Sequence, residues 1–292
     1  MKNPFPFLQI AIWLLRAGAD KTFPLNDYIY DDEKWATQIK DIISDSYKDQ
    51  ECEFTLVGHM KDNSSFYLNM FPEYKLDLLP EFHDGLSATD IRTNLFENLS
   101  GIDLLDYLSK CVTSDVARDL FEFTETEEFK DLQEEYFYFK KEKEKLKDYP
   151  YKDTLKFNCA DAVVECNGYI LLIKRKKAPG KGSWALPGGF VNTNETYLAA
   201  AKRELLEETG LDISKLLTDN VSEGLIFDHP SRGCGIPRIT MGVYFNIDSV
   251  KQFPYIKASD DAIEAKWINI NDLKAMILHD DHMDIIESFI QK

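Results

Sequence analysis

Three carboxylates crowd one end of a predicted helix: Glu204, Glu207 and Glu208, in the stretch ETYLAAAKRELLEETG. At about 100° per residue they fall within one third of the helix circumference. Negative charge is unfavourable near a helix C-terminus, because the helix dipole is already negative there. The cluster therefore needs a compensating positive charge.

The spacing around these carboxylates argues against an ordinary solvated acidic face. Asn194 and Gly210 are expected to cap the helix, and an apolar face is expected from Leu198, Leu205 and Leu206. The defined positions are Gly189, Glu195 six residues later, then Arg203-Glu204-Leu205, Glu207-Glu208 and Gly210-Leu211.

This spacing resembles the 23-residue signature of the Nudix hydrolases at every defined position. The resemblance implies metal-dependent cleavage of a nucleoside diphosphate linked to another moiety. Oxygen ligands suit hard cations, so Mg²⁺, or alternatively Mn²⁺, would supply the missing charge. The implied catalytic set is Glu195, Arg203, Glu204, Glu207 and Glu208. The three clustered glutamates and the Gly188 carbonyl are the implied metal ligands, and Arg203 is expected to pair with Glu195.

A second segment bears on the substrate. FDHPSRGCGIPRIT, residues 227–240, resembles the branch of the family that cleaves ADP-ribose. That resemblance implies substrate contacts from Phe227, Arg232 and Arg238, with one arginine on the terminal ribose phosphate. Arg175, in a basic stretch before the signature, is a further candidate for steering phosphate.

The general base is left open among Asp260, Asp261, Glu264 and the signature glutamates. His279 and His282, three residues apart, are expected to pack or start a helix rather than bind metal.

Residues 155–292 must position these groups. Two apolar runs flank Asn167-Gly168, which is typical of a hairpin, and strands both precede and follow the central helix. The pattern predicts the α/β fold class. The family resemblance implies a C-terminal Nudix α/β/α sandwich preceded by an incomplete Rossmann-like domain. The expected N-terminal domain comprises residues 1–125, and the expected Nudix domain comprises residues 155–292. A charged helical connector is expected between them, at residues 126–154.

The N-terminal part predicts a strand at residues 52–58 and a helix at 87–99. With the Nudix half, it resembles the bifunctional NMN adenylyltransferase/Nudix hydrolases of bacterial NAD metabolism. The nucleotide-binding residues implied by the resemblance are Gly58, Lys61, Asp62, Ser87, Thr89 and Arg92. Ser87 could equally form a plain capping box.

The adenylyltransferase motif His-x-Gly-His is absent from the printed sequence. Either the recorded start is too late or this half is degenerate. The first hypothesis is an ADP-ribose pyrophosphatase that yields AMP and ribose 5-phosphate and carries a vestigial or truncated partner domain. The alternatives are a fully bifunctional enzyme, if the recorded start is too late, and a sensor that binds ADP-ribose without cleaving it. The intact carboxylates favour the enzyme.

Composition limits the remaining classes of function and cellular location. The net charge of −17 disfavours nucleic-acid binding, and five scattered cysteines suit a reducing cytoplasm. The apolar run near the N-terminus is broken by Gln9 and followed by Arg16, which predicts a helix rather than a signal or membrane span. A homo-oligomer is left open.

Overall fold

The computed structural model describes residues 7–48, 51–58, 63–79, 87–98, 100–216, 223–247, 251–273, 275–276 and 278–290. The chain forms two compact units, Asn3–Lys130 and Asp131–Lys292, and the division falls inside one long helix. Each unit is described by itself.

The N-terminal unit is an α/β arrangement around two short parallel strands, β1 (Thr55–Gly58) and β2 (Lys75–Leu78). Its α-helices are α1 (Phe7–Arg16), α2 (Asp32–Tyr47), α3 (Ala88–Thr93), α4 (Gly101–Cys111) and α5 (Ser114–Phe123), together with a 3₁₀ helix at Asn63–Asn69 and a π-helix at Asn94–Asn98. The predicted strand is confirmed at its C-terminal part. The predicted helix begins as expected but ends its α-helical part at Thr93.

The C-terminal unit contains a mixed sheet that follows α6 (Glu127–Leu146). The strands are β3 (Phe157–Cys166), β4 (Tyr169–Arg175), β5 (Trp184–Ala185), β6 (Gly188–Phe190), β7 (Glu223–Phe227), β8 (Arg238–Asn246) and β9 (Ala262–Asn269). The order is β5-β4-β3-β8-β7, with β6 paired to β3 and β9 paired to β4. Strands β3 and β8 run parallel, and the predicted hairpin joins β3 to β4.

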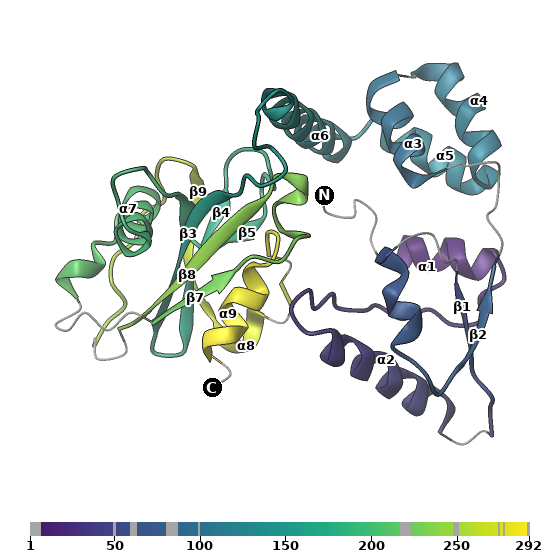
Figure 1. The fold of residues 1–292 in the computed structure, drawn as a ribbon, viewed down its shortest axis with the longest axis horizontal. Coiled ribbons are helices and arrows are strands. Elements are labelled where there is room, and N and C mark those ends of the chain that lie inside the picture. Colours follow the sequence, from purple (N-terminus) through teal and green to yellow (C-terminus); the bar gives the residue numbers. More distant parts are fainter. Residues whose placement is uncertain are drawn as a thin grey trace. The chain divides into compact units, whose positions relative to one another are not determined.

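Helices cover both faces of this sheet, as Figure 1 shows: α7 (Tyr197–Thr209) on one face, α8 (Ile270–Leu273) and α9 (His282–Ile290) on the other. Alternate residues of β3 face opposite sides of the sheet. Ala162 and Val164 pack in the cluster that contains Leu205 of α7, whereas Val163 packs with Ile285 of α9. The predicted α/β/α sandwich is therefore confirmed.

The caps of α7 differ in part from the prediction. Thr196, not Asn194, is the N-cap, and its side chain accepts a hydrogen bond from the Ala199 N–H. Gly210 ends the helix with φ +69°, a conformation that costs glycine little. Leu205 is fully buried, but Leu206 is 46% exposed, so the expected apolar face is narrower than predicted.

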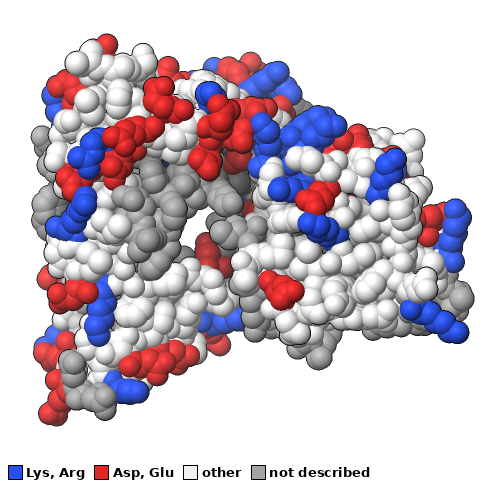
Figure 2. Space-filling model, turned by 180° about the vertical axis from the view of Figure 1, so that it is seen from behind, with Lys and Arg blue, Asp and Glu red and all other residues white. Residues whose placement is uncertain are grey.

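On the face drawn in Figure 2, acidic and basic side chains lie next to one another rather than in separate areas. Because the protein has a net charge of −17, it would need locally gathered cations to bind an anionic ligand. In the described part of the chain, no helix combines the length and apolar character that crossing a membrane requires.

Candidate active site

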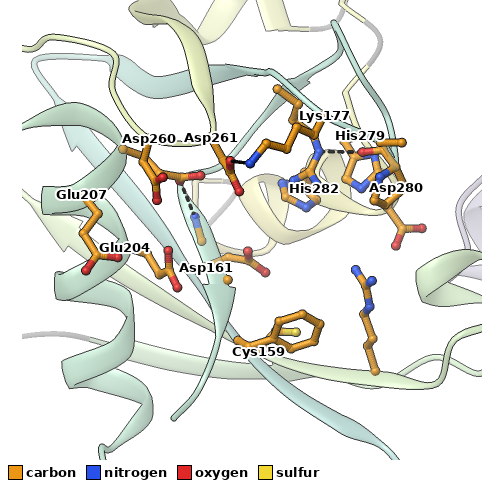
Figure 3. Close-up of a pocket in the computed structure, with 18 of the residues that line it drawn as sticks. Cys159, Asp161, Lys177, Glu204, Glu207, Asp260, Asp261, His279, Asp280 and His282 are labelled. Carbon is orange, nitrogen blue, oxygen red and sulfur yellow. Dashed lines mark hydrogen bonds and ion pairs between the residues drawn. The ribbon is translucent and has the colours of Figure 1, made fainter. Parts of the chain in front are cut away.

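A cavity of about 500 Å³ opens where β3, β6 and α7 meet the loops after β4 and before β9 and α9. That volume suits a small-molecule ligand. Figure 3 shows Glu204 and Glu207 on one side, His279 and Asp280 on the other, and Cys159 and Asp161 between them. The predicted residues that line it are Arg175, Gly188, Arg203, Glu204, Glu207, Glu208, Arg232, Arg238, Asp260, Asp261, His279 and His282.

Arg203 organises the carboxylates of α7. Its guanidinium makes two bonds to Glu195, Nε to Oε2 at 3.0 Å and Nη2 to Oε1 at 2.7 Å. Its Nη1 reaches Glu204 at 2.7 Å and Glu207 at 3.0 Å. The Arg203 bonds hold the pKa of Glu195 at about 2, so that partner is a fixed carboxylate. The expected pairing of Arg203 with Glu195 is present.

The glycine pair before α7 allows a close approach of strand and helix. A Cβ atom at Gly189 would lie 2.4 Å from Oε1 of Glu204, so a side chain at this position would displace the Glu204 carboxylate. The Gly188 N–H donates to Oε2 of Glu208 at 3.0 Å. The backbone of β6 therefore lies directly against the carboxylates of α7.

Glu208 is the most buried carboxylate of the cluster, with only 4% of its surface exposed. Burial raises its pKa to about 8, and the charge of Glu204 acts in the same direction. Burial also raises the pKa of Glu204. Both groups would ionise more readily beside an added positive charge.

The donor set fits a divalent cation. It consists of hard carboxylate oxygens. The pKa values of the buried Glu208 and the partly buried Glu204 are raised, so both side chains resist ionisation. Among the described residues, no three His, Cys, Asp or Glu side chains already converge as a metal-binding group. The hydrogen bonds account for this, because Arg203 holds Glu204 and Glu207 while Glu208 turns to the Gly188 N–H.

Sequence reasoning missed Asp161, a buried carboxylate of β3 that lines the same cavity. It accepts a hydrogen bond from the Thr240 hydroxyl at 2.6 Å. A signal was present in the sequence, because an aspartate inside the apolar run NCADAVVEC must bury a charge if the run is a strand. Cys159 also lines the cavity, and burial raises its thiol pKa to about 12.

Besides Arg203, three arginines line the cavity, each with different contacts. Arg175 donates from Nε to the Pro179 carbonyl at 2.8 Å, and burial lowers its pKa. Arg232 is buried in a two-bond ion pair with Asp281, at 2.8 and 3.0 Å. Arg238 lies over the Phe190 ring at 5.4 Å, and its buried Nε has no hydrogen-bond partner among the described residues.

The candidates for general base separate by position. Asp260 and Asp261 line the cavity, whereas Glu264 lies outside its lining and pairs with Lys266. Lys177 engages Asp261 at 2.6 Å, as Figure 3 shows. The charge of Asp260 contributes to the raised pKa of Glu204, which places these two carboxylates near each other.

The structure places two other candidates in packing positions. Phe227 is buried in the core beneath α9 rather than in the cavity wall. His282 begins α9, and its Nδ1 accepts the Leu186 N–H at 2.8 Å. Burial lowers the pKa of His279, so its ring is neutral near pH 7.

The candidates in the N-terminal unit are only partly described. Gly58 ends β1, and a Cβ there would lie 2.5 Å from Leu68 Cδ2. Lys61 and Asp62 lie outside the described residues. Ser87 forms a complete capping box with Asp90, and Arg92 donates to the Thr89 hydroxyl at 3.3 Å.

Comparison with known proteins agrees with this site. The NUDIX domain model matches residues 157–289. An ADP-ribose pyrophosphatase from Methanocaldococcus jannaschii is 37% identical over 134 residues, 45% of this chain and 71% of that protein.

The similarity extends to the N-terminal unit. The crystal structure of a bifunctional NMN adenylyltransferase/ADP ribose pyrophosphatase from Francisella tularensis is 31% identical, with a TM-score of 0.84. It covers 99% of this chain and 86% of that one. A second structure from that organism, complexed with AMP and a Mn ion, is 30% identical with a TM-score of 0.82 and the same coverage. The chain is therefore a Nudix hydrolase, a member of the Nudix family whose Nudix domain follows a Rossmann-like, NMN adenylyltransferase-like domain.

Proposed function

We propose that the C-terminal unit hydrolyses the pyrophosphate of ADP-ribose to AMP and ribose 5-phosphate, with Mg²⁺ as the metal. The observation that carries the proposal is the α7 site. The complete signature brings three carboxylates to one wall of a cavity whose other walls carry arginines. The similarity to the M. jannaschii ADP-ribose pyrophosphatase supports this choice of substrate.

Glu204, Glu207 and Glu208 would hold the metal, together with the Gly188 carbonyl. A bound divalent cation neutralises the pyrophosphate and lowers the pKa of an attacking water. Arg203 keeps Glu204 and Glu207 close together while they lack a cation. Glu195 in turn fixes the orientation of Arg203 through two bonds.

Arg238 is the best candidate for the terminal ribose phosphate. Its buried Nε has no hydrogen-bond partner within the described part of the chain, and an anionic oxygen would satisfy this donor. Arg232 shares the cavity wall, but two of its nitrogens already bind Asp281. Arg175 would face the pyrophosphate, since the charge of Glu208 acts on it.

Asp260 is the preferred general base. It lies close enough to Glu204 to affect its pKa, and Lys177 binds the neighbouring Asp261 instead. A carboxylate at this place could accept a proton from the attacking water. Asp260→Asn should lower kcat far more than it raises KM.

For the N-terminal domain, we propose nucleotide binding through Gly58, Lys61, Asp62, Thr89 and Arg92, with Ser87 serving as the helix cap. The Francisella protein, bifunctional by its description, supports this proposal. Catalysis of adenylyl transfer is a separate matter, since the sequence contains no His-x-Gly-His.

The test is product analysis with purified protein, ADP-ribose and Mg²⁺. Equal amounts of AMP and ribose 5-phosphate should form, and chelation of the metal should stop the reaction. A panel that includes NADH, nucleoside triphosphates and nucleotide sugars should show ADP-ribose as the best substrate. Tight binding of ADP-ribose without any turnover would favour a sensor.

A further inference from the structure

Helix α6 reaches the cavity from outside the sequence that the NUDIX model matches, which begins at residue 157. Tyr138 of α6 lines the cavity together with the residues of the Nudix signature. The site is therefore incomplete without a segment that precedes the matched domain.

Two contacts hold α6 against the loop after β4. Glu135 is buried, with 8% of its surface exposed, and its Oε2 accepts the Gly180 N–H at 2.7 Å. One turn earlier, Asp131 accepts from Lys181 at 2.7 Å. Burying a carboxylate is costly unless it is hydrogen-bonded, so the Glu135 contact fixes the position of the helix.

The same contacts place Tyr138. It lies three residues after Glu135 and therefore on the same face of α6. The loop that Glu135 holds includes Pro179, whose carbonyl accepts the Arg175 Nε bond. Tyr138, Ala178 and Pro179 all line the cavity, and they form an apolar part of a wall that is otherwise mostly charged.

The cavity has a second aromatic ring, but that ring already has a partner. Phe190 lies under the Arg238 guanidinium at 5.4 Å. Arg238 takes one face of this ring, and Phe157 packs against it at a centroid distance of 5.8 Å. Although Phe190 is 50% exposed, these two contacts leave less of its ring surface to a planar ligand group. The half-buried ring of Tyr138 has an edge contact with Phe139, at a centroid distance of 5.5 Å.

We propose that Tyr138 contacts the base of the nucleotide substrate, and that Glu135 is a positioning residue that holds Tyr138 and the Arg175 loop in place. This inference rests on the proposed function of the cavity. A purine is planar and apolar on its faces, whereas the phosphates belong among the arginines and the carboxylate-bound metal. The base would therefore lie between α6 and the loop at residues 178–180.

The first test is steady-state kinetics with ADP-ribose and Mg²⁺. Tyr138→Ala should raise KM about tenfold and leave kcat within about twofold, because stacking on one aromatic ring is commonly of that size. Tyr138→Phe should retain the wild-type KM. The matched control is Phe137→Ala, which removes an exposed neighbouring ring that does not line the cavity.

The second test measures binding without turnover. The fluorescent nucleotide 1,N6-etheno-AMP should bind about tenfold more weakly to Tyr138→Ala. Ribose 5-phosphate, which has no base, should inhibit hydrolysis equally well in both proteins. Equal losses for both ligands would show a general distortion and overturn the contact with the base.

Glu135→Ala should raise KM for ADP-ribose as well, and Glu135→Gln should restore it, since the amide oxygen can still accept the Gly180 N–H. An active wild type whose KM is unchanged by Tyr138→Ala would overturn this inference and leave the proposed function standing. A wild type that binds etheno-AMP but cleaves no ADP-ribose would instead refute the proposed function.

Discussion

Replacement of Glu208 by glutamine should stabilise the metal-free C-terminal unit at neutral and alkaline pH. Glu208 is 4% exposed, and its pKa in the fold is about 8 against an ordinary value of 4.5. A raised carboxyl pKa means that the fold prefers the protonated form. Its contribution to stability is therefore complete below about pH 4.5 and is lost as the pH rises through about 8.

The magnitude follows from 1.36 kcal/mol for each pKa unit. The cost of keeping Glu208 in the fold is about 3 kcal/mol at pH 7 and approaches about 5 kcal/mol above pH 8. Burial raises the pKa of Glu204 too, so that residue adds a dependence of the same sign. Glutamine retains an oxygen for the Gly188 N–H and has no charge to bury.

The assay is urea unfolding between pH 5.5 and 9 in the presence of a chelator. A background with Trp13→Phe and Trp35→Phe leaves Trp184 and Trp267 as the reporters, both in the C-terminal unit. The parent protein, which carries the two Trp→Phe changes and keeps Glu208, should lose stability steadily as the pH rises. The Glu208→Gln variant of that parent should lose much less stability over the same range.

Glu207→Gln is the matched control, because the Glu207 side chain is 46% exposed and solvent screens its charge. Added Mg²⁺ should recover stability at high pH in the parent and much less in Glu208→Gln. Parallel pH curves for the parent and Glu208→Gln would refute the claim that this carboxylate is buried at a cost.

Three further predictions concern function. Glu207→Gln should lower turnover by about a hundredfold or more by removing a metal-binding charge, and near-full Mg²⁺-dependent activity would exclude Glu207 from the site. Arg238→Ala should reduce kcat/KM for ADP-ribose more than for a substrate without the terminal phosphate, and equal losses would argue against that contact. The 292-residue polypeptide, which has no His-x-Gly-His, should form no NAD from NMN and ATP at a useful rate. Robust NAD synthesis in a coupled assay would contradict this.

The sequence predicted the layers of the C-terminal unit because local patterns and tertiary packing agree there. The Asn167-Gly168 turn sets the hairpin, and the burial of β3 on both faces suits its apolar run. The cap of α7 was two residues off, since Asn194 and Thr196 both suit an N-cap and the loop geometry selects Thr196.

The signature carboxylates could be predicted because their spacing is local to one helix. Other parts of the site depend on contacts between distant segments, which spacing along the chain does not encode. Phe227 turned into the core, and Tyr138 reached the cavity from a helix expected to serve as a connector. Glu264 and Asp260 could not be told apart in sequence, because a single turn before β9 decides which carboxylate faces the cavity.

The proposed hydrolysis of ADP-ribose at the α7 site is tested most directly by running the reaction in water enriched in ¹⁸O, with Mg²⁺ and the full chain. Attack of water on the pyrophosphate should give AMP and ribose 5-phosphate in equal amounts, with one ¹⁸O in only one of the two products. The reaction should stop on chelation and be lost in Glu208→Gln. Full metal-dependent cleavage by Glu208→Gln, or no cleavage by a wild type that binds ADP-ribose, would contradict the account.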